Sequence, residues 1–202
     1  MSHYFEDIEH KSDDFFSFED YINNKVYKFN SCNNVFAKNE VDYGTQVLIK
    51  AVINNFDELG ERVLDLGCGY GAIGISLADH YKNSKFLMSD ITNTAVTLAK
   101  QNLKLNGITN AEVVVSNLFQ NIDGEFNFIA TNPPIKIGKS VLLNLISESQ
   151  NRLQNDGHLV LVIKKSHGKD SIKKVMEQTF GNCTVLKRDA GYYILDSQKI
   201  KG

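Results

Sequence analysis

The feature that most constrains the fold of this chain is a regular alternation of short apolar runs with longer amphipathic stretches between residues 62 and 164. The apolar runs have the length of buried strands, and apolar residues three and four apart are typical of helices. Strands are predicted at residues 62–66, 85–89, 112–116, 126–131 and 158–164, and helices at 72–81, 93–106 and 139–153. A further helix is predicted over residues 39–55, before the first of these strands. This order predicts an α/β protein with a mostly parallel sheet covered by helices on both faces.

Both ends of the chain depart from this rhythm. Residues 15–31 form a predicted β-hairpin, with aromatic and aliphatic residues on either side of a turn at Asn23 and Asn24. After a helix over residues 172–180, strands at 183–188 and 192–195 are separated by only three residues, a loop that joins antiparallel neighbours. We therefore expect an N-terminal extension over residues 1–33 and one α/β domain over residues 34–202, whose sheet closes with an antiparallel strand.

Composition narrows the classes of protein that need to be considered. The 202 residues carry a formal net charge of -2, so nucleic-acid binding would need a local basic patch. Cys32, Cys68 and Cys183 are far apart, and the histidines lack ligand spacing, which predicts neither disulfides nor a metal site. Without a long apolar run, we expect no membrane segment and a cytoplasmic protein. The oligomeric state stays open, with a monomer as the working expectation.

A glycine-rich loop follows the first strand of the α/β region. The sequence Asp-Leu-Gly-Cys-Gly-Tyr-Gly at residues 65–71 runs directly into a predicted helix. Gly67, Gly69 and Gly71 allow a tight turn and a close approach of the backbone to a ligand. Gly74 also completes a nominal dinucleotide-binding spacing, but Asp65 would repel a phosphate and suits a cationic ligand better. The alternative is a strand-to-helix turn with no ligand.

Two further segments follow the next strands at the same predicted edge. Asp90 ends the second strand, where a carboxylate can accept both hydroxyl hydrogens of a ribose; its alternative role is to cap the following helix. Asn117 ends the third strand, where its amide can meet an adenine edge with Leu118 or Phe119 against the ring; an Asx turn is the alternative. Because open α/β sheets bind ligands at the carboxyl ends of their strands, these segments predict one shared site.

The only two prolines of the chain follow the fourth strand in the sequence Asn-Pro-Pro-Ile, residues 132–135. Pro133 holds Asn132 extended, so the amide is presented rigidly at the sheet edge. The amide oxygen and a neighbouring carbonyl can accept two hydrogen bonds from one planar NH₂ group. Such acceptors favour a pyramidal nitrogen and direct its lone pair toward an electrophile, which lowers the barrier to alkylation. A strand-terminating turn is the alternative interpretation.

Together, residues 65–71 and 132–135 resemble the corresponding motifs of class I S-adenosylmethionine-dependent methyltransferases that methylate amino groups. The stretch 35–44 is similar to an N-terminal motif of the small-domain 16S ribosomal RNA guanine-N2 methyltransferases. Residues 132–139 and the Gly-Tyr-Tyr segment at 191–193 also resemble that group, and the likeness extends over roughly residues 34–195.

The resemblance implies a Rossmann-like sheet of seven strands with an antiparallel last strand, and S-adenosylmethionine as the cofactor. With the motif analysis it predicts cofactor contacts at Asp65, Gly67, Cys68, Gly69, Gly71, Asp90, Ile91, Asn117, Leu118 and Asn132, and catalysis at Asn132, Pro133, Pro134 and Ile135. Many amino methyltransferases carry Tyr or Phe where Ile135 stands. This difference removes π-stacking there and weakens an assignment to adenine or cytosine.

Basic residues after the fourth and fifth strands suggest where RNA would bind. Lys136, Lys139, Lys164 and Lys165 are predicted to contact phosphates without reading the base sequence. The resemblance implies methylation of a guanine in small-subunit ribosomal RNA, either free or within the 30S particle. Two alternatives remain: a protein glutamine methyltransferase, because a side-chain amide is also a planar NH₂ group, and a non-catalytic ribosome-assembly factor that retains the fold.

Overall fold

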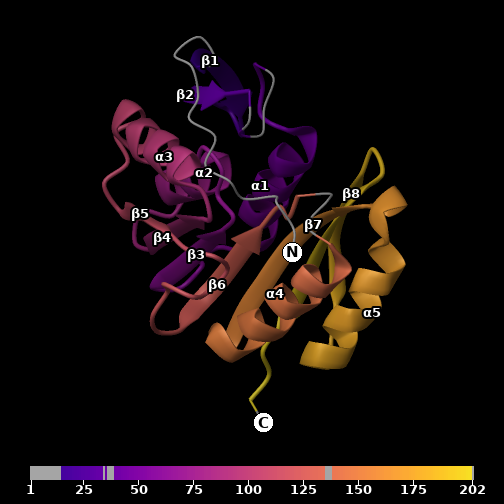
Figure 1. Cartoon of the computed structure of the whole chain (residues 1–202). Coiled ribbons are helices and arrows are strands. Elements are labelled where there is room, and N and C mark those ends of the chain that lie inside the picture. Colours follow the sequence, from indigo (N-terminus) through magenta and orange to yellow (C-terminus); the bar gives the residue numbers. More distant parts are fainter. Residues whose placement is uncertain (1–14, 34, 36–38, 135–137, 202) are drawn as a thin grey trace.

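The computed structural model describes residues 15–33, 35, 39–134 and 138–201. The described chain contains a two-stranded hairpin followed by alternating helices and strands (Figure 1). In chain order the elements are β1 (Phe15–Ile22), β2 (Lys25–Cys32), α1 (Tyr43–Asn55), β3 (Arg62–Leu66), α2 (Ala72–His80), β4 (Lys85–Asp90), α3 (Asn93–Leu105), β5 (Ala111–Val115), β6 (Phe126–Thr131), α4 (Lys139–Arg152), β7 (Leu153–Lys164), η2 (Lys165–His167), α5 (Lys169–Phe180), β8 (Thr184–Asp189) and β9 (Tyr192–Gln198).

The main sheet has seven strands in the order β5-β4-β3-β6-β7-β9-β8. The pairs from β5 to β7 are parallel, whereas β9 is antiparallel to both β7 and β8. This arrangement confirms the predicted α/β class, the mostly parallel sheet and the antiparallel last strand. The strand order reverses between β3 and β6, and open α/β sheets bind their ligands in the crevice that such a reversal creates.

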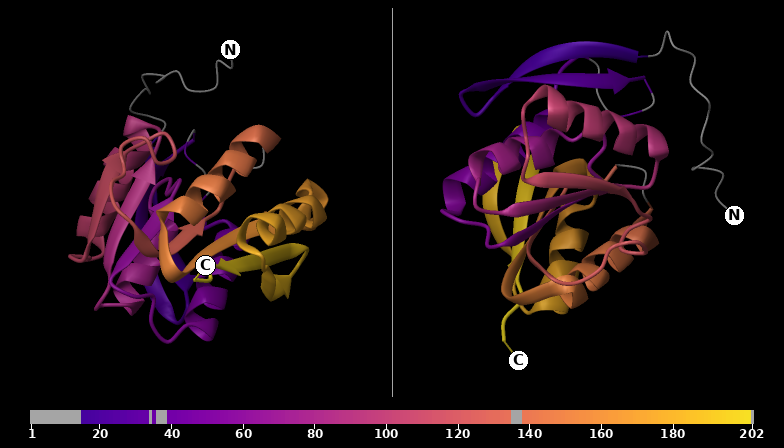
Figure 2. Two further views of the ribbon diagram at one scale, coloured as in Figure 1. Left: turned by 90° about the horizontal axis from the view of Figure 1, so that it is seen from below. Right: turned by 90° about the vertical axis from the view of Figure 1, so that its left-hand side faces the viewer.

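Helices cover both faces of the sheet, as Figures 1 and 2 show. Along β7, alternate side chains enter two different cores: Val160 and Val162 pack with α1, α2 and α3, and Leu159 and Leu161 pack with α4 and α5. Successive side chains of a strand point to opposite faces, so a strand buried on both sides must be apolar throughout. This explains the continuous apolar runs on which the α/β prediction rests.

The predicted N-terminal hairpin is confirmed as the two-stranded sheet β1–β2. Asn23 and Asn24 form its turn with φ values of 45° and 66°, a conformation that asparagine tolerates and that matches the twist of the paired strands. The hairpin stacks over α3, separate from the seven-stranded sheet (Figure 2). The division between an extension and a methyltransferase domain at residues 33 and 34 stays a prediction.

Asn102 in α3 and Asn106, the residue directly after this helix, bind the backbone at the edge of the hairpin in the way a neighbouring strand would. The Asn102 side chain accepts from the Asn30 N–H at 2.7 Å and donates to the Asn30 carbonyl at 2.9 Å. The Asn106 side chain does the same with Lys28, at 3.0 and 2.7 Å. Asn102 also donates to the carbonyl of Tyr70 at 2.8 Å, which connects the hairpin to the glycine loop.

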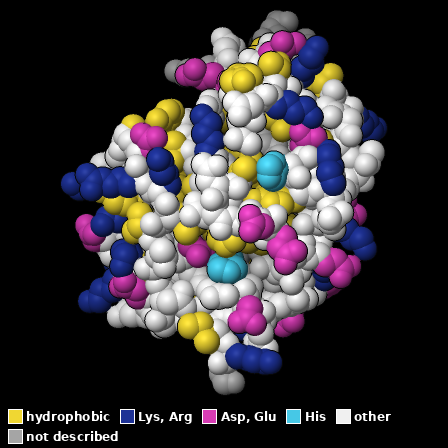
Figure 3. Space-filling model, turned by 180° about the vertical axis from the view of Figure 1, so that it is seen from behind, with side chains coloured by type: hydrophobic (Ala, Val, Ile, Leu, Met, Phe, Trp, Pro, Cys, Tyr) yellow, Lys and Arg dark blue, Asp and Glu magenta, His cyan; other side chains and the backbone are white. Residues whose placement is uncertain are grey.

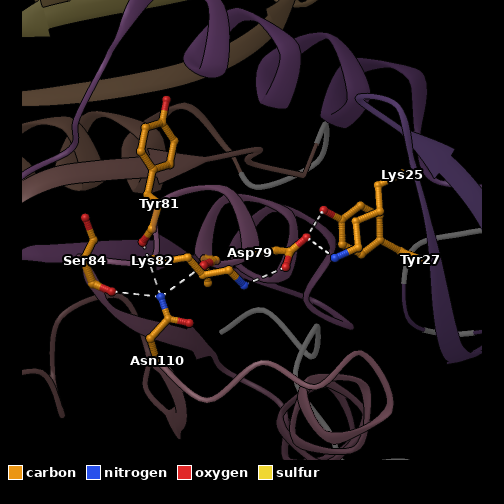
Figure 4. A network of polar contacts seen from close by, with 8 residues as sticks. Lys25, Tyr27, Asp79, Tyr81, Lys82, Ser84 and Asn110 are labelled. Atoms are coloured by element: carbon orange, nitrogen blue, oxygen red, sulfur yellow. Dashed lines mark hydrogen bonds and ion pairs between the residues drawn. The ribbon is translucent and has the colours of Figure 1, made fainter.

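A polar network attaches the hairpin to α2 (Figure 4). The Asp79 carboxylate accepts from the Lys25 ammonium at 2.6 Å, the Tyr27 hydroxyl at 2.8 Å and the Lys82 ammonium at 2.7 Å. Burial alone would raise the pKa of Asp79, but these three donors outweigh it and lower the pKa to about 2. Beside this network, the Asn110 amide donates to carbonyls at the end of α2.

Three elements begin at positions that differ from the predicted ones. Helix α1 begins at Tyr43, because the Asp42 side chain accepts from the Thr45 N–H and caps the helix. Helix α5 begins at Lys169, three residues early, where its polar first turn shows no apolar periodicity. Strand β7 begins at Leu153 rather than residue 158, because Leu153 pairs with Phe126 across a register shift.

Candidate active site

A cavity of about 280 Å³ lies along the carboxyl ends of β3, β4, β5 and β6. Four segments that are far apart in the sequence form much of its wall: residues 66–70, 90–92, 116–118 and 131–134. The structure therefore brings together most of the predicted site residues, namely Gly67, Cys68, Gly69, Asp90, Ile91, Asn117, Leu118, Asn132, Pro133 and Pro134. Asp65 and Gly71 are not part of this wall, and Ile135 falls outside the described residues.

The glycine loop forms the floor of this cavity. The N–H groups of Gly67 and Cys68 both donate to the Ser89 carbonyl at 2.8 Å, which folds the loop over the end of β4. Gly67 and Gly69 have φ values of +75° and +56°, and a Cβ on either would meet no atom closer than 3.9 Å. A side chain at these positions would therefore project into the cavity, so the two glycines keep its floor open.

Gly71 has a different role. Its φ is +102°, and a Cβ there would lie 2.8 Å from the methyl carbon of Met88 and 3.0 Å from Ile75. This glycine lets α2 start close against β4 and supports the loop from below. Gly71 therefore has a packing role, and we propose no direct contact between it and a cofactor.

Asp65 supports the loop from inside the protein, with only 1% of its surface exposed. Its Oδ2 accepts from the Gly74 N–H at 2.8 Å, whereas no described group bonds its Oδ1. Burial raises the pKa of Asp65 to about 7, the Gly74 hydrogen bond opposes this shift, and the charge of Asp90 adds to it. A cation held in the cavity would favour the ionised form of this carboxyl group.

Asp90 combines a structural contact with a position in the cavity wall. Its Oδ2 accepts from the Gly69 N–H at 2.9 Å, and its Oδ1 accepts from the N–H and the hydroxyl of Thr92 at 3.1 and 3.2 Å. The alternative role as a helix cap is not observed, since Thr92 caps α3 by accepting from the Ala95 N–H. The carboxylate oxygens have further lone pairs available for a ligand.

The turn after β5 is held by Ser116. The Ser116 hydroxyl donates to the Leu118 carbonyl at 2.7 Å and accepts from the Asn121 N–H at 3.0 Å. Leu118 has a φ of 48°, and its side chain reaches the cavity wall together with exposed Asn117. The turn therefore does not depend on the Asn117 side chain, which suits the ligand-binding role predicted for it.

The side-chain amide of Asn132 is held in one orientation by the start of α1. Its Nδ2 donates to the Asp42 carboxylate at 3.1 Å and to the Thr45 hydroxyl at 2.8 Å. Because a carboxylate can only accept, the amide nitrogen must face Asp42, and the amide oxygen is turned away from α1. The Thr131 hydroxyl fixes the preceding residue by donating to the Leu66 carbonyl at 2.7 Å.

A second cavity, of about 240 Å³, adjoins the first. Asn132, Pro133 and Pro134 belong to the walls of both cavities, so the Asn-Pro-Pro turn separates and connects them. The rest of the second wall comes from Asp42 before α1, the start of α4, the end of β7, His167 in η2, the start of α5 and Tyr192 at the start of β9. Asn132 thus stands at the junction of two spaces, each large enough for a small molecule or a side group of a larger one.

The predicted basic residues are distributed unevenly around the second cavity. Lys139 and Lys164 line it, whereas Lys165 is exposed in η2 outside its wall and Lys136 falls outside the described residues. His167, which belongs to the same basic stretch of the sequence as Lys164 and Lys165, also lines it. On the face opposite that of Figure 1, basic and acidic side chains are interspersed (Figure 3). Of the predicted basic residues, Lys139 and Lys164 are therefore the two that reach the cavity in the described part of the chain.

Asp42, Thr45 and Tyr192 are site residues to which no role was assigned from the sequence. The cap at Asp42 could have been recognised, because aspartate directly before a helical pattern is a preferred N-cap residue. The contact of Asp42 and Thr45 with Asn132 spans about 90 residues and is formed only by the folded sheet. Tyr192 lies in a segment used only for its likeness to relatives, and no local pattern shows that it reaches a cavity.

Two kinds of feature are not found in the part of the chain that the structure describes. No helix there is long and apolar enough to span a bilayer. No three His, Cys, Asp or Glu side chains there come together in a way that could hold a metal ion.

The chain is similar to known proteins over most of its length. The methyltransferase small domain family matches residues 26–196. YbxB, an uncharacterised protein of Bacillus subtilis, is 39% identical over 183 residues, which is 89% of either chain. Ribosomal RNA small subunit methyltransferase C of Actinobacillus pleuropneumoniae is 38% identical over 132 residues, or 63% of this chain and 40% of the relative.

Among solved structures, the Thermus thermophilus 16S rRNA N2 G1207 methyltransferase RsmC, in complex with AdoMet and guanosine, has a TM-score of 0.83 and 25% identity. The match covers 92% of this chain and 50% of that one. The present chain thus spans about half or less of the ribosomal RNA methyltransferases that it matches.

The sheet order and the ligand edge define a Rossmann-like methyltransferase of class I, a class that uses S-adenosylmethionine as methyl donor. Within that class, the chain belongs to the methyltransferase small domain family, and its site is of the RsmC type.

Proposed function

We propose that this chain transfers a methyl group from S-adenosylmethionine to the exocyclic 2-amino group of a guanine in small-subunit ribosomal RNA. The observation that carries the proposal is the position of Asn132, in the wall common to both cavities, with its NH₂ group bound by Asp42 and Thr45. The names of two relatives, a small-subunit ribosomal RNA methyltransferase and a 16S rRNA N2 methyltransferase bound to guanosine, support this choice of substrate.

The residues of the first cavity fit S-adenosylmethionine. Gly67 and Gly69 leave room for a ligand on the loop, and Asp90 offers carboxylate oxygens to the ribose hydroxyls. Asn117 and Leu118 are available to the adenine. The buried Asp65 carboxyl, whose Oδ1 has no hydrogen-bond partner among the described residues, lies behind the loop. Its ionised form would attract the positively charged methionine end of the cofactor across the loop. When bound, this cofactor supplies an electrophilic methyl group on a sulfonium.

The second cavity receives the amine. The amino nitrogen of guanine is a weak nucleophile, because its lone pair is delocalised into the ring. The Asn132 Oδ1 and the adjacent backbone carbonyl accept the two amino hydrogens, which favours the pyramidal nitrogen of the transition state. Pro133 and Pro134 keep this turn rigid, so the acceptors need no reorganisation. The alkylated nitrogen is acidic and releases its proton afterwards, so no strong base is required.

Lys139 and Lys164, together with Lys136 and Lys165, hold the RNA backbone near the second cavity in this proposal. Lysine–phosphate contacts position RNA without selecting a base. A base in a helix must leave the stack before its amino group can reach Asn132. Binding should therefore weaken steeply with salt, whereas the choice of base depends on the cavity.

The test is methyl transfer with labelled S-adenosylmethionine to 16S ribosomal RNA, to 30S particles and to ribosomal protein, using Asn132→Ala. We expect label in a guanosine of the RNA, a loss of kcat of about 100-fold or more in the variant, and cofactor affinity close to wild type, since the amide acts mainly on the amine. Asn144→Ala, at an exposed asparagine of α4, is the matched control and should keep full activity.

Other results would identify the alternatives. Label in a glutamine of ribosomal protein and none in RNA would indicate a protein methyltransferase. Full activity of Asn132→Ala would contradict the catalytic role of this amide. Absence of transfer to every substrate, with wild-type ribosome assembly in cells that carry Asn132→Ala, would indicate a non-catalytic factor.

A further inference from the structure

We propose that Tyr192 is the aromatic platform on which the target base stacks in the second cavity. The inference rests on the proposed function, because it assumes that the cavity receives a nucleobase. Many amino methyltransferases supply an aromatic ring directly after the two prolines, but this chain has Ile135 at that position. A planar base still gains most from a flat π-surface, so the ring must come from elsewhere in the wall.

Tyr192 and His167 are the aromatic side chains in the described wall of that cavity, and Tyr192 has the larger ring. Tyr192 shares the wall with Asn132, Pro133 and Pro134. Tyr192 stands at the start of β9, directly after the two-residue turn, Ala190 and Gly191, that follows β8. The antiparallel strand that distinguishes this sheet therefore brings the tyrosine back to the edge where β6 presents Asn132. A base between them would have a ring against one side and two acceptors at its amino group.

The ring of Tyr192 is held in place on one edge. A Cβ on Gly44 would lie 2.7 and 2.8 Å from its Cε1 and Cδ1 atoms, so this position in α1 accommodates only glycine while the ring stays there. The Tyr43 ring adds a tilted contact, with centroids 5.9 Å apart. Gly44 thus lets the ring lie directly on α1, next to Asp42, which orients Asn132. The same helix start positions both the proposed platform and the acceptor.

The Tyr192 ring already carries a weak contact that a base can replace. The Lys164 ammonium lies 5.4 Å from the ring centroid, and Lys164 is exposed. An exposed cation–π contact of this kind changes an equilibrium by about two- to fivefold. Stacking of a base on an aromatic side chain changes it by about five- to 150-fold. The base is therefore favoured on the ring, and Lys164, on its flexible stem, can move to a phosphate.

The stacking surface of the Tyr192 ring can be tested separately from its hydroxyl. Burial, and then the charge of Asp42, raise the pKa of Tyr192, so the side chain stays neutral throughout the physiological range. A neutral phenol and a phenyl ring offer nearly the same stacking surface. Substitution by phenylalanine therefore separates a platform from a hydroxyl that donates a proton or a hydrogen bond.

The test compares Tyr192→Phe, Tyr192→Leu and the control Tyr21→Leu. Tyr21 lies in β1, is 59% exposed and is not in the cavity wall. Two readouts are used: kcat/KM for methyl transfer to 16S ribosomal RNA, and calorimetric binding of guanosine monophosphate to protein saturated with S-adenosylhomocysteine. We expect Tyr192→Leu to lose about five- to 150-fold in both readouts, and the other two variants to stay within about threefold. The affinity for S-adenosylhomocysteine should be unchanged in all three.

The two readouts separate failure of this inference from failure of the proposed function. Normal kcat/KM and nucleotide binding in Tyr192→Leu would overturn the platform while leaving the methyltransferase intact. Equal losses in Tyr192→Phe and Tyr192→Leu would overturn it in favour of the hydroxyl. Ring-dependent nucleotide binding without methyl transfer to RNA would uphold the platform and contradict the proposed reaction. A wild-type protein that binds no nucleotide and methylates no RNA would contradict both.

Discussion

The side chain at residue 132 must donate hydrogen bonds to α1 and also offer an acceptor to the substrate. Asparagine does both, whereas no charged or apolar side chain does. The amide NH₂ pairs with the Asp42 carboxylate and the Thr45 hydroxyl, while its oxygen is left as an acceptor. Aspartate would place a second negative charge 3.1 Å from Asp42, and alanine would remove the acceptor. The proposed chemistry therefore depends on a hydrogen bond between α1 and the end of β6 as well as on the two prolines.

Asp65 gives the protein a pH-dependent stability of its own. An aspartate that titrates near 3.9 when unfolded and at about 7 when folded binds more protons in the folded state, so its contribution to stability falls as pH rises from 4 to 7. Asp65→Asn keeps an acceptor for the Gly74 N–H but does not titrate. We expect the variant to lose this slope, gaining on wild type by up to about 1.4 kcal/mol per pH unit within that window.

Denaturant unfolding of both proteins at several pH values, without cofactor, measures this difference. The readout is the change of the stability difference with pH rather than its size at one pH, because the new amide NH₂ carries a constant cost of its own. Parallel curves for the two proteins between pH 4 and 8 would show that Asp65 is ionised throughout.

Among the elements, the hairpin β1–β2 is joined to the cofactor edge by α3. Asn102 bonds Asn30 of the hairpin and the Tyr70 carbonyl of the glycine loop, whereas Asn106 bonds only Lys28 and its own helix. Phe18 and Phe29 pack against the Tyr70 ring at 5.9 and 5.3 Å. The hairpin therefore acts as a support for the loop beneath the cofactor.

This difference predicts unequal effects of the same substitution at two positions. Asn102→Leu leaves three buried backbone groups without partners and should cost about 3 kcal/mol or more of unfolding free energy, with weaker cofactor binding. Asn106→Leu affects more exposed groups and should cost about 1 kcal/mol, with cofactor binding unchanged. Thermal unfolding and calorimetric titration with S-adenosylhomocysteine measure both quantities. Equal losses in the two variants, or full cofactor affinity in Asn102→Leu, would contradict the support.

The positions of most elements could be predicted from the sequence because each has a local cause. Strands buried on both faces are apolar throughout, and Gly107 follows the end of α3, as expected for a helix that stops at glycine. Element starts were less predictable where a side-chain cap or a tertiary contact sets them. The cap formed by Asp42 sets the start of α1 at Tyr43, and pairing with Phe126 extends β7 back to Leu153.

Across the whole molecule, the sequence predicted the cofactor edge better than the substrate cavity. The glycine loop, Asp90 and Asn117 each follow a strand, and parallel strands bring their carboxyl ends to one edge, so their meeting follows from topology alone. The second cavity joins residues 42, 132, 164 and 192, which come from elements of different kinds and depend on how β9 returns along β7. No local sequence pattern predicts that these four residues meet.

The most direct test of the account is a crystal structure of the protein with S-adenosylhomocysteine and guanosine bound together. We predict S-adenosylhomocysteine on Gly67 and Gly69, and the 2-amino nitrogen of guanosine within about 3 Å of the Asn132 Oδ1. Guanosine bound with its amino group away from Asn132, or an Asn132 amide whose oxygen faces Asp42, would contradict the claim that methyl donor and amine meet at this turn.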